Sequence, residues 1–236
     1  MVDIEKLLYQ AKLSEAANRP EKTFSLMEQI VKSKKEDLNA EERQLFHSSY
    51  KHIITSIRAS CNKINEIYEH EKKKESKSLK LILKLKENLE QELKETCLRM
   101  LDLIEKYLVN KASSPDSRVL YYKLKGDYNR YLAMFFSDNN NYSSTALVAY
   151  TKATEEAESL SCINPIKIDL ALSFSVFYYD VLKNAEEAIN VATEALNEGI
   201  DKLEKIDDQD MKDATASLQM LKDNIDNWTK GKVDDI

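Results

Sequence analysis

Apolar residues recur every three or four positions along almost the whole chain, a spacing that places them on one face of an α-helix. The longest such stripes cover residues 46–68 and 79–108. Shorter stripes fill the second half, after a break at 110–115. The pattern predicts an all-α protein of nine helices, joined by loops short enough to make neighbouring helices antiparallel.

Helix-start signals mark several of the breaks between these stripes. Asn39 with Glu42, and Asn184 with Glu187, have the spacing of a capping box, in which two side chains and two backbone amides satisfy one another. Proline suits the first helical position, where a missing N–H costs nothing. The other predicted boundaries are Pro20, Pro115 with Ser114 as its cap, and the breaks at 137–144, 164–165, 183–184 and 207–210.

Composition supports this assignment and indicates one domain. The 236 residues include only three glycines and three prolines, too few for the many tight turns of a β-sandwich or of an α/β enzyme. No segment has the composition of a flexible linker. We therefore expect a single helical domain over 1–236, with four helices in 1–110, five in 111–230, and a short disordered tail at 231–236.

The charge and hydropathy of the chain exclude two classes of partner. The net charge of −6 disfavours nucleic acid, which needs a basic surface. The most apolar window, 170–179, is about half of a membrane span and predicts a buried core helix, with no membrane insertion. The charged first ten residues do not resemble a signal peptide. We expect a cytoplasmic protein, with the nucleus as an additional compartment.

The sequence contains no pattern typical of catalysis, a metal site or a cofactor. Cys61, Cys97 and Cys162 are odd in number and far apart, which predicts buried, reduced thiols. His47 and His52 would lie roughly 140° apart around a helix and could not form a metal pair. The glycines are isolated, so there is no phosphate-binding loop. These observations predict a non-enzymatic protein with no catalytic residues, metal or cofactor.

Four basic residues form two pairs with the same spacing along the chain. Lys51 and Arg58 are seven positions apart, which is two turns on one helix face, and Lys123 and Arg130 repeat this interval. If the two faces oppose each other, they form a basic pocket suited to a phosphate of charge about −1.5 to −2. The tyrosine after Arg130 adds a phenol donor, and Asp127 could hold the arginine in place. The solvated side of an ordinary helix is the alternative interpretation.

The alanine-rich segment 146–200 suggests a different function. Small residues with aromatic fillers also occur at the helix crossings of tetratricopeptide repeats, whose period is about 34 residues. Here Ala149 and Ala188 are 39 positions apart, and their neighbours do not match. A helical-repeat scaffold that binds unphosphorylated peptides therefore remains the alternative function.

Several stretches resemble the 14-3-3 family, and together they extend in order from about residue 7 to residue 230. They are LNAEER at 38–43 followed by Tyr50 and Lys51, LYYKLKGDYNRY at 120–131, LALSFSVFYYD at 170–180, and LKDNIDNW at 221–228. The resemblance implies a nine-helix cup that dimerises through the helices of 1–110. It also implies an adaptor that binds phosphoserine or phosphothreonine segments of partner proteins.

The resemblance also implies two sets of binding residues. The phosphate would be bound by Lys51, Arg58, Arg130 and Tyr131. The groove for the extended peptide, with Asn224 hydrogen-bonded to the peptide backbone, would be lined by Lys123, Leu172, Ser173, Val176, Asp180, Met220, Asn224 and Trp228.

The chain departs from the family pattern around this groove. Ser173 stands where the family has a second asparagine, and Asp169 stands where it has a glycine. Ala216 and Ser217 replace two large aliphatic residues of the groove wall. The departures predict weaker or differently selective peptide binding. Away from the groove, Cys61 replaces a tryptophan, which predicts a smaller core there.

The resemblance places a homodimer interface on the first four helices. Arg19 and Glu92 could form one ion pair across it, but Lys22 and Asn88 occupy the positions of a second pair. Phosphorylation of Ser60 would oppose dimerisation by adding charge. The expected interface residues are Leu13, Ala17, Arg19, Ser60, Leu85, Leu89 and Glu92.

Overall fold

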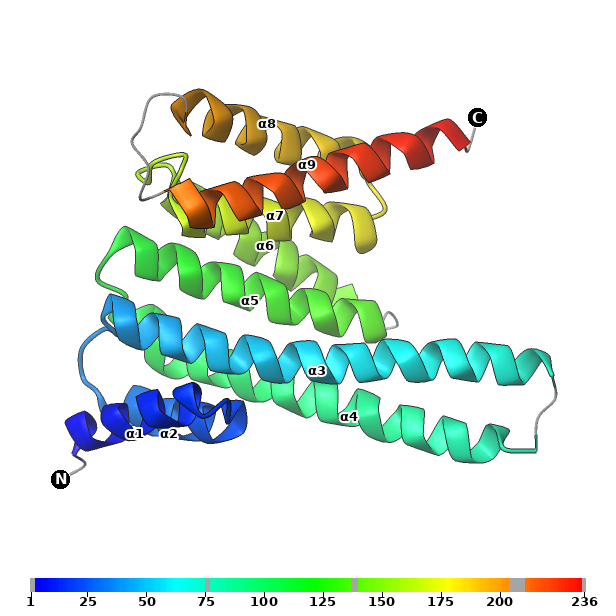
Figure 1. Cartoon of the computed structure of the whole chain (residues 1–236), viewed down its shortest axis with the longest axis horizontal. Coiled ribbons are helices and arrows are strands. Elements are labelled where there is room, and N and C mark those ends of the chain that lie inside the picture. Colours follow the sequence, from blue (N-terminus) through cyan, green and yellow to red (C-terminus); the bar gives the residue numbers. More distant parts are fainter. Residues whose placement is uncertain (1–2, 75–76, 137–139, 204–210, 235–236) are drawn as a thin grey trace. The chain divides into compact units, whose positions relative to one another are not determined.

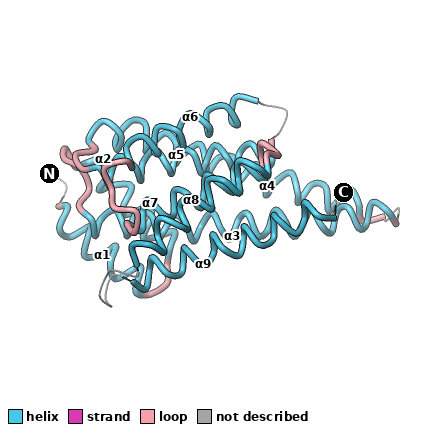
Figure 2. The backbone as a smooth tube through the Cα atoms, turned by 90° about the horizontal axis from the view of Figure 1, so that it is seen from above, coloured by secondary structure: helices cyan, strands magenta, loops and turns pink. Residues whose placement is uncertain are grey.

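A computed structural model describes residues 3–74, 77–136, 140–203 and 211–234. Within these ranges the chain forms nine α-helices and no β-strand, which confirms the predicted all-α fold (Figure 1). In Figure 2 the described loops, drawn in pink, are short beside the helices that they join. The helices are α1 (Ile4–Ala16), α2 (Pro20–Ser33), α3 (Ala40–Lys73), α4 (Leu79–Leu103), α5 (Pro115–Phe135), α6 (Asn140–Ala157), α7 (Pro165–Asp180), α8 (Ala185–Leu203) and α9 (Met211–Asp234).

Two of the predicted helix starts are confirmed by capping hydrogen bonds, and a third by its proline. The Glu42 amide donates to Asn39 Oδ1 at 2.9 Å, and the Asn39 amide donates to Glu42 Oε2 at 2.8 Å, which completes a capping box. The amide of Glu187 donates to Asn184 Oδ1 at 3.1 Å. Pro20 is the first residue of α2. These local signals were sufficient because each cap involves residues only three positions apart.

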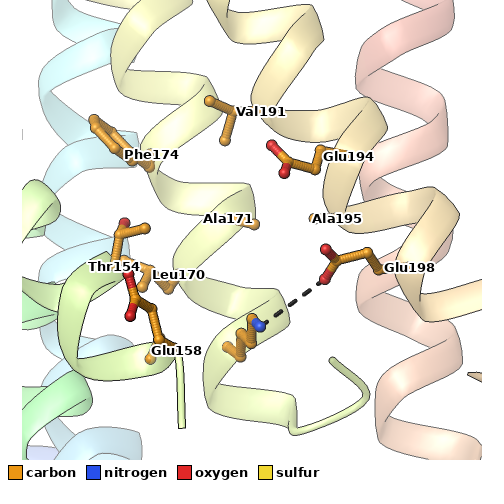
Figure 3. A pocket seen from close by; sticks show the side chains of 11 residues that line it. Thr154, Glu158, Leu170, Ala171, Phe174, Val191, Glu194, Ala195 and Glu198 are labelled. Carbon is orange, nitrogen blue, oxygen red and sulfur yellow. Dashed lines mark ion pairs between the residues drawn. The ribbon is translucent and has the colours of Figure 1, made fainter. Parts of the chain in front are cut away.

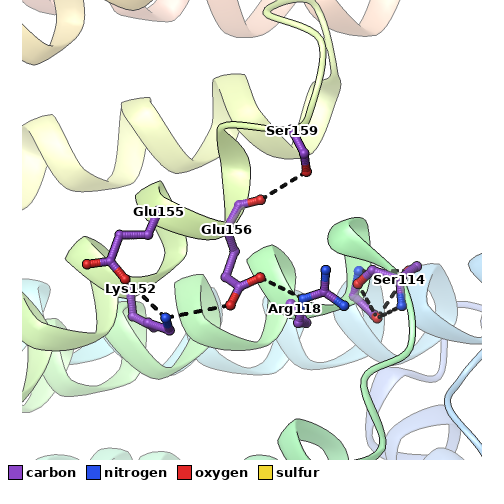
Figure 4. A network of polar contacts seen from close by, with 7 residues as sticks. Ser114, Arg118, Lys152, Glu155, Glu156 and Ser159 are labelled. Carbon is purple, nitrogen blue, oxygen red and sulfur yellow. Dashed lines mark hydrogen bonds and ion pairs between the residues drawn. The ribbon is translucent and has the colours of Figure 1, made fainter.

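The start of α5 is also held by a longer-range contact. Ser114 caps the helix by accepting from the Ser117 amide at 3.1 Å, with Pro115 as the first helical residue. One turn later, Arg118 Nε donates to Glu156 Oε2 at 2.6 Å near the end of α6 (Figure 4). Lys152 contacts the same carboxylate of Glu156 at 3.7 Å. This network holds the beginning of α5 against the end of α6.

Some predicted boundaries differ from those in the structure. The stripe expected to run unbroken to Leu108 is α-helical only to Leu103, and a π-helical turn (Ile104–Leu108) and a 3₁₀ turn (Val109–Lys111) follow. Apolar spacing indicates which face is buried, but it does not specify which carbonyl each amide bonds. The predicted break at 207–210 lies outside the described residues.

Two non-helical segments in the second half of the chain are shorter than predicted. The break expected over 137–144 includes the first turn of α6, which begins at Asn140. A disordered tail was expected over 231–236. This prediction is wrong for 231–234, because α9 continues to Asp234. Residues 235–236 lie outside the described residues. One glycine costs a helix only about 1 kcal/mol, so Gly231 does not end α9.

The chain divides into two compact units, an N-terminal unit (Met1–Ala112) and a C-terminal unit (Ser113–Ile236), close to the division at 110 expected within one domain. In the N-terminal unit, α1 packs against α2 and α3, and α3 packs against α4. Phe24, Phe46 and Tyr50 are buried there, and Tyr50 donates its hydroxyl to the Thr96 carbonyl at 2.6 Å. This bond joins α3 to α4.

In the C-terminal unit, α5 packs against α6 and α7, and α7 also packs against α8 and α9. Gly126 allows a close α5–α6 contact, because a Cβ at this position would lie 2.7 Å from the Tyr150 ring. The ring of Tyr150 stacks on Phe174 of α7 with centroids 5.1 Å apart. Tyr150 therefore occupies the junction of three helices.

Two of the three cysteines are buried, as the sequence analysis expected. Cys61 and Cys97 are buried, and burial raises the pKa of Cys61 to about 11 and that of Cys97 to about 12. Cys162 was expected to be buried but is partly exposed, because it lies in the turn between α6 and α7. Among the described residues, no cluster could hold a metal ion, and no helix is long and apolar enough to cross a bilayer.

Candidate functional site

A cluster of charged side chains lies along α5. Lys123, Asp127 and Arg130 occupy successive turns of this helix, and all three are buried. Lys123 Nζ lies 2.9 Å from Asp127 Oδ2, and Arg130 Nη2 lies 3.5 Å from Asp127 Oδ1. The contact between Asp127 and the arginine that the sequence suggested is therefore present. Because the carboxylate of Asp127 contacts both cations, it fixes the distance between the Lys123 ammonium and the Arg130 guanidinium.

Tyr150 of α6 completes this cluster. Its hydroxyl donates to Asp127 Oδ1 at 2.7 Å and accepts from Arg130 Nε at 3.2 Å. The absence of a Cβ at Gly126 allows the ring to approach α5 closely enough for both bonds. The guanidinium of Arg130 is consequently held through two of its donors, and a guanidinium has five.

The electrostatic interactions within the cluster keep its acidic and basic groups ionised. Burial alone would raise the pKa of Asp127, but Lys123, Arg130 and the Tyr150 hydroxyl lower it to about 2. Burial opposes the charge on Lys123, but the carboxylates of Asp127 and Asp169 outweigh it and raise the pKa of Lys123. Arg130 likewise has a raised pKa despite its burial, through Tyr150, Tyr131 and Asp127. The cluster is thus ionised at neutral pH.

A second carboxylate reaches the cluster from α7. Lys123 Nζ lies 2.7 Å from Asp169 Oδ2, and the Asp169 side chain is 31% exposed. The ammonium of Lys123 is therefore shared between Asp127 on its own helix and Asp169 on another. Asp169 is one of the departures from the family pattern noted in the sequence, and the structure shows that its carboxylate contacts Lys123.

Tyr131 lies beside Arg130 at the edge of the cluster. The Arg130 guanidinium carbon is 4.6 Å from the centroid of the Tyr131 ring, which is a cation–π contact. The Tyr131 ring also makes an edge contact with Tyr128, with centroids 6.1 Å apart. The arrangement combines a fixed guanidinium with a phenol one residue away, and both groups can donate hydrogen bonds to an oxyanion.

The structure places the predicted phosphate-binding residues in two groups. Arg130 and Tyr131 lie together on α5 in the C-terminal unit. Lys51 and Arg58 lie two turns apart on α3 in the N-terminal unit, where Lys51 is exposed and Arg58 is partly exposed. Each group is described within its own unit, and the pocket that would combine them remains a prediction.

Three of the predicted groove residues share one apolar cluster. Leu172 and Val176 of α7 pack with Trp228 of α9, and Trp228 stacks on Tyr179 with centroids 4.9 Å apart. Met220 is 55% exposed on α9 and is not part of this cluster. The remaining predicted groove residues on these two helices are partly exposed, namely Ser173, Asp180 and Asn224.

The predicted dimer residues lie on the surface of the N-terminal unit. Leu13 of α1 is 52% exposed and Leu85 of α4 is 49% exposed. Tyr9 and Leu81, which the sequence analysis did not single out, are also exposed on these helices. The other predicted interface residues are exposed or partly exposed, namely Ala17, Arg19, Ser60, Leu89 and Glu92.

Sequence reasoning did not identify the role of Tyr150. The hydroxyl of Tyr150 reaches Asp127, 23 positions away, and no local pattern predicts that contact. Gly126 was the available signal, because a glycine inside a helix often marks the close approach of a neighbouring side chain.

Within the described residues the fold is all-helical. Its main polar cluster consists of an arginine, a lysine and the carboxylates that hold them. This combination is typical of a helical binding protein. The family model described as 14-3-3 protein matches residues 10–229, and the chain belongs to the 14-3-3 family. This is a family of non-enzymatic adaptor proteins, as the sequence resemblance implied.

Curated relatives match over nearly the whole chain. The 14-3-3 protein 2 of Entamoeba histolytica is 37% identical over 238 residues, covering 100% of both chains. The 14-3-3-like protein GF14 chi of Arabidopsis thaliana is 39% identical, covering 98% of this chain and 89% of the relative. The 14-3-3 protein epsilon of Drosophila melanogaster is 37% identical, covering 97% and 88%.

Proposed function

We propose that this chain is an adaptor that binds phosphoserine or phosphothreonine segments of partner proteins. The observation that carries the proposal is the fixed guanidinium of Arg130, hydrogen-bonded to Tyr150 and paired with Asp127, beside the phenol of Tyr131. In this proposal Lys51 and Arg58 of α3 complete the phosphate pocket. No catalytic step is proposed.

The mechanism is recognition by a preorganised charge cluster. Asp127 and Tyr150 occupy two donors of Arg130 and thereby restrict its side chain before any ligand arrives. The donors that remain can bond a phosphate, and a charge-assisted bond is roughly twice as strong as a neutral one. Little side-chain entropy is then lost on binding, which favours affinity.

The peptide on either side of the phosphate would lie along α7 and α9. Leu172, Val176 and Trp228 offer an apolar surface, and the partly exposed amide of Asn224 offers a donor and an acceptor for an extended backbone. Ser173, a shorter side chain than asparagine, would hold that backbone at fewer points. This difference predicts lower affinity than the family pattern gives.

The proposal includes a homodimer and a cytoplasmic location, with the nucleus as an additional compartment. The exposed leucines Leu13 and Leu85 would be covered in the dimer, together with the other predicted interface residues. A dimer presents two binding sites, so a doubly phosphorylated partner would bind with avidity rather than with the affinity of one site.

The test is the affinity for a fluorescent Arg-x-x-phosphoserine-x-Pro peptide beside its unphosphorylated twin, measured by polarisation. We expect at least about a hundredfold preference for the phosphopeptide, and at least about a tenfold loss in Lys51→Gln and in Arg58→Lys. Lys80→Gln, an exposed lysine on α4, is the matched control and should bind normally. Equal binding of both peptides would refute the proposal.

A further inference from the structure

A cavity of about 230 Å³ lies between α6, α7 and α8 in the C-terminal unit (Figure 3). Both α6 and α8 pack on α7, and three alanines face the space between them: Ala157, Ala171 and Ala195. Larger side chains at these positions would fill it. The cavity thus lies in the alanine-rich segment that suggested a peptide-binding scaffold, and phosphate recognition makes no use of it.

The inner wall of the cavity is apolar. Leu170 and Phe174 of α7 line it, and both side chains are buried in the hydrophobic cluster around Tyr150. Val191 of α8 lines the other side. An apolar side chain entering this space would exchange water for contacts with three hydrophobic residues, which is favourable by roughly 25 cal/mol for each Å² covered.

The rim of the cavity is acidic. Glu158, the residue after α6, stands on one side, and Glu194 and Glu198 of α8 stand on the other (Figure 3). Lys167 lies 3.9 Å from Glu198, which leaves three carboxylates against one ammonium. Glu158 and Glu194 are exposed, and neither forms an ion pair with a described residue. The mouth of the cavity is therefore suited to cationic groups.

The cavity lies on the opposite side of α7 from the predicted groove. At 100° per residue, Ala171 and Phe174 lie roughly 150° around the helix from Leu172 and Val176. The packing agrees, because Phe174 belongs to the cluster around Tyr150 whereas Leu172 and Val176 pack with Trp228. A ligand in the cavity would leave the groove side of α7 free.

We propose that this cavity is a second docking site, which takes one large apolar side chain flanked by lysines or arginines in an unmodified segment of a partner protein. Its volume is below the roughly 300–1,000 Å³ of typical small-molecule sites but suits a single aromatic or branched side chain. The acidic rim supplies the charge complementarity for the flanking basic residues. The site does not depend on phosphate, and it would strengthen the binding of a partner whose phosphorylated segment occupies the groove.

The test uses a fluorescein-labelled Lys-Lys-Phe-Lys-Lys peptide and the full chain, with Lys-Lys-Ser-Lys-Lys and Glu-Glu-Phe-Glu-Glu peptides as controls. We expect the first peptide to bind at least about tenfold more tightly than either control by polarisation. Saturating Arg-x-x-phosphoserine-x-Pro peptide should leave this binding unchanged. Failure of the phosphopeptide to bind would refute the proposed function, and it would not affect this comparison.

Two variants examine the cavity itself. Ala171→Leu should fill the space, and Glu194→Lys should reverse the charge of one rim residue. Each substitution should weaken the binding of the Lys-Lys-Phe-Lys-Lys peptide at least about fivefold. Glu186→Lys, an exposed glutamate on the same helix as Glu194, is the matched charge control and should have little effect. If Ala171→Leu unfolds the chain, the comparison of Glu194→Lys with Glu186→Lys decides whether the peptide binds at the cavity.

Four outcomes would overturn the proposal. The first is equal binding of the phenylalanine and serine peptides, and the second is an equal loss in Glu194→Lys and Glu186→Lys. The third is displacement of the peptide by phenethylammonium at comparable concentration, which would indicate a site for small amines. The fourth is a change in the sedimentation of the protein alone in Glu194→Lys, which would indicate a second copy of this chain in the cavity.

Discussion

Lys123 Nζ contacts Asp169 Oδ2 at 2.7 Å, which ties a buried cation of α5 to a partly exposed carboxylate of α7. Lys123 is also paired with Asp127 at 2.9 Å, so two carboxylates surround one ammonium. The family resemblance places a glycine at position 169, which has no side chain to make this contact. The second ion pair is thus a property of this chain, and it lowers the positive charge available on the groove side of α5.

Removal of the Asp169 charge should strengthen phosphopeptide binding. In Asp169→Asn, Lys123 keeps Asp127 as its partner, and the net charge near the groove becomes more positive by one. We expect the dissociation constant to fall by about three- to tenfold, and the gain to shrink with added salt, which screens the exposed part of the interaction. Polarisation with the phosphoserine peptide at low and high salt measures both effects.

The matched control is Asp226→Asn, which removes the same charge from an exposed position on α9. It should change the affinity by less than about twofold. An equal gain in both variants would assign the effect to net charge alone and not to the contact with Lys123.

The geometry of the Arg130 guanidinium should matter more than its charge. Arg130→Lys keeps one positive charge but loses the planar fork that bonds Tyr150 and Asp127 and that would bond two phosphate oxygens. We expect phosphopeptide affinity to fall by about 2 kcal/mol or more, which is roughly thirtyfold. Unchanged affinity in a variant that still unfolds cooperatively would place the phosphate elsewhere.

The lowered pKa of Asp127 predicts acid sensitivity of the fold. Its pKa is about 2 in the folded chain and about 3.9 when unfolded, so its stabilisation is present above about pH 4. It is lost as the pH falls from about 4 to about 2, because both states then bind the proton. A shift of this size corresponds to about 2 kcal/mol of unfolding free energy.

Urea unfolding of the wild type and of Asp127→Asn measures this contribution. The wild type should be the more stable by about 2 kcal/mol at pH 6, and the difference should shrink steadily below pH 4. A difference that stays constant down to pH 3 would mean that Asp127 titrates normally.

Gly126 should tolerate no side chain without a loss of stability. In Gly126→Ala the new Cβ would lie 2.7 Å from two carbons of the Tyr150 ring, so the ring or α6 must move. We expect a loss of about 1–3 kcal/mol of unfolding free energy, as overpacked cores show, despite the higher helix propensity of alanine. Chemical unfolding measures the change, and a more stable Gly126→Ala variant would contradict the close contact.

The exposed leucines of the N-terminal unit should control self-association. Leu85→Glu places a charge at a 49% exposed apolar position of α4, and burial of that charge in a dimer would be costly. Sedimentation should show a shift from dimer to monomer. Leu98→Glu, at a 43% exposed position of the same helix outside the predicted interface, should leave the dimer intact.

Much of the fold was predictable because helical structure is encoded locally. The capping box of Asn39 and Glu42 spans three residues, and the apolar stripe of α3 repeats with every turn. The extension of α9 past Gly231 and the π-helical turn after Leu103 were not predicted, because both depend on hydrogen bonding that periodicity does not specify.

The sequence by itself determined the helical class, the helix starts, the 14-3-3 resemblance and the charged residues Lys123, Asp127 and Arg130 on one face of a helix. Only the tertiary structure decided that Tyr150 and Asp169 complete this cluster. It also decided that three alanines leave a cavity beside acidic side chains. The physical reason is that helix formation and capping act over three or four residues, whereas these contacts join residues whose proximity depends on how whole helices pack.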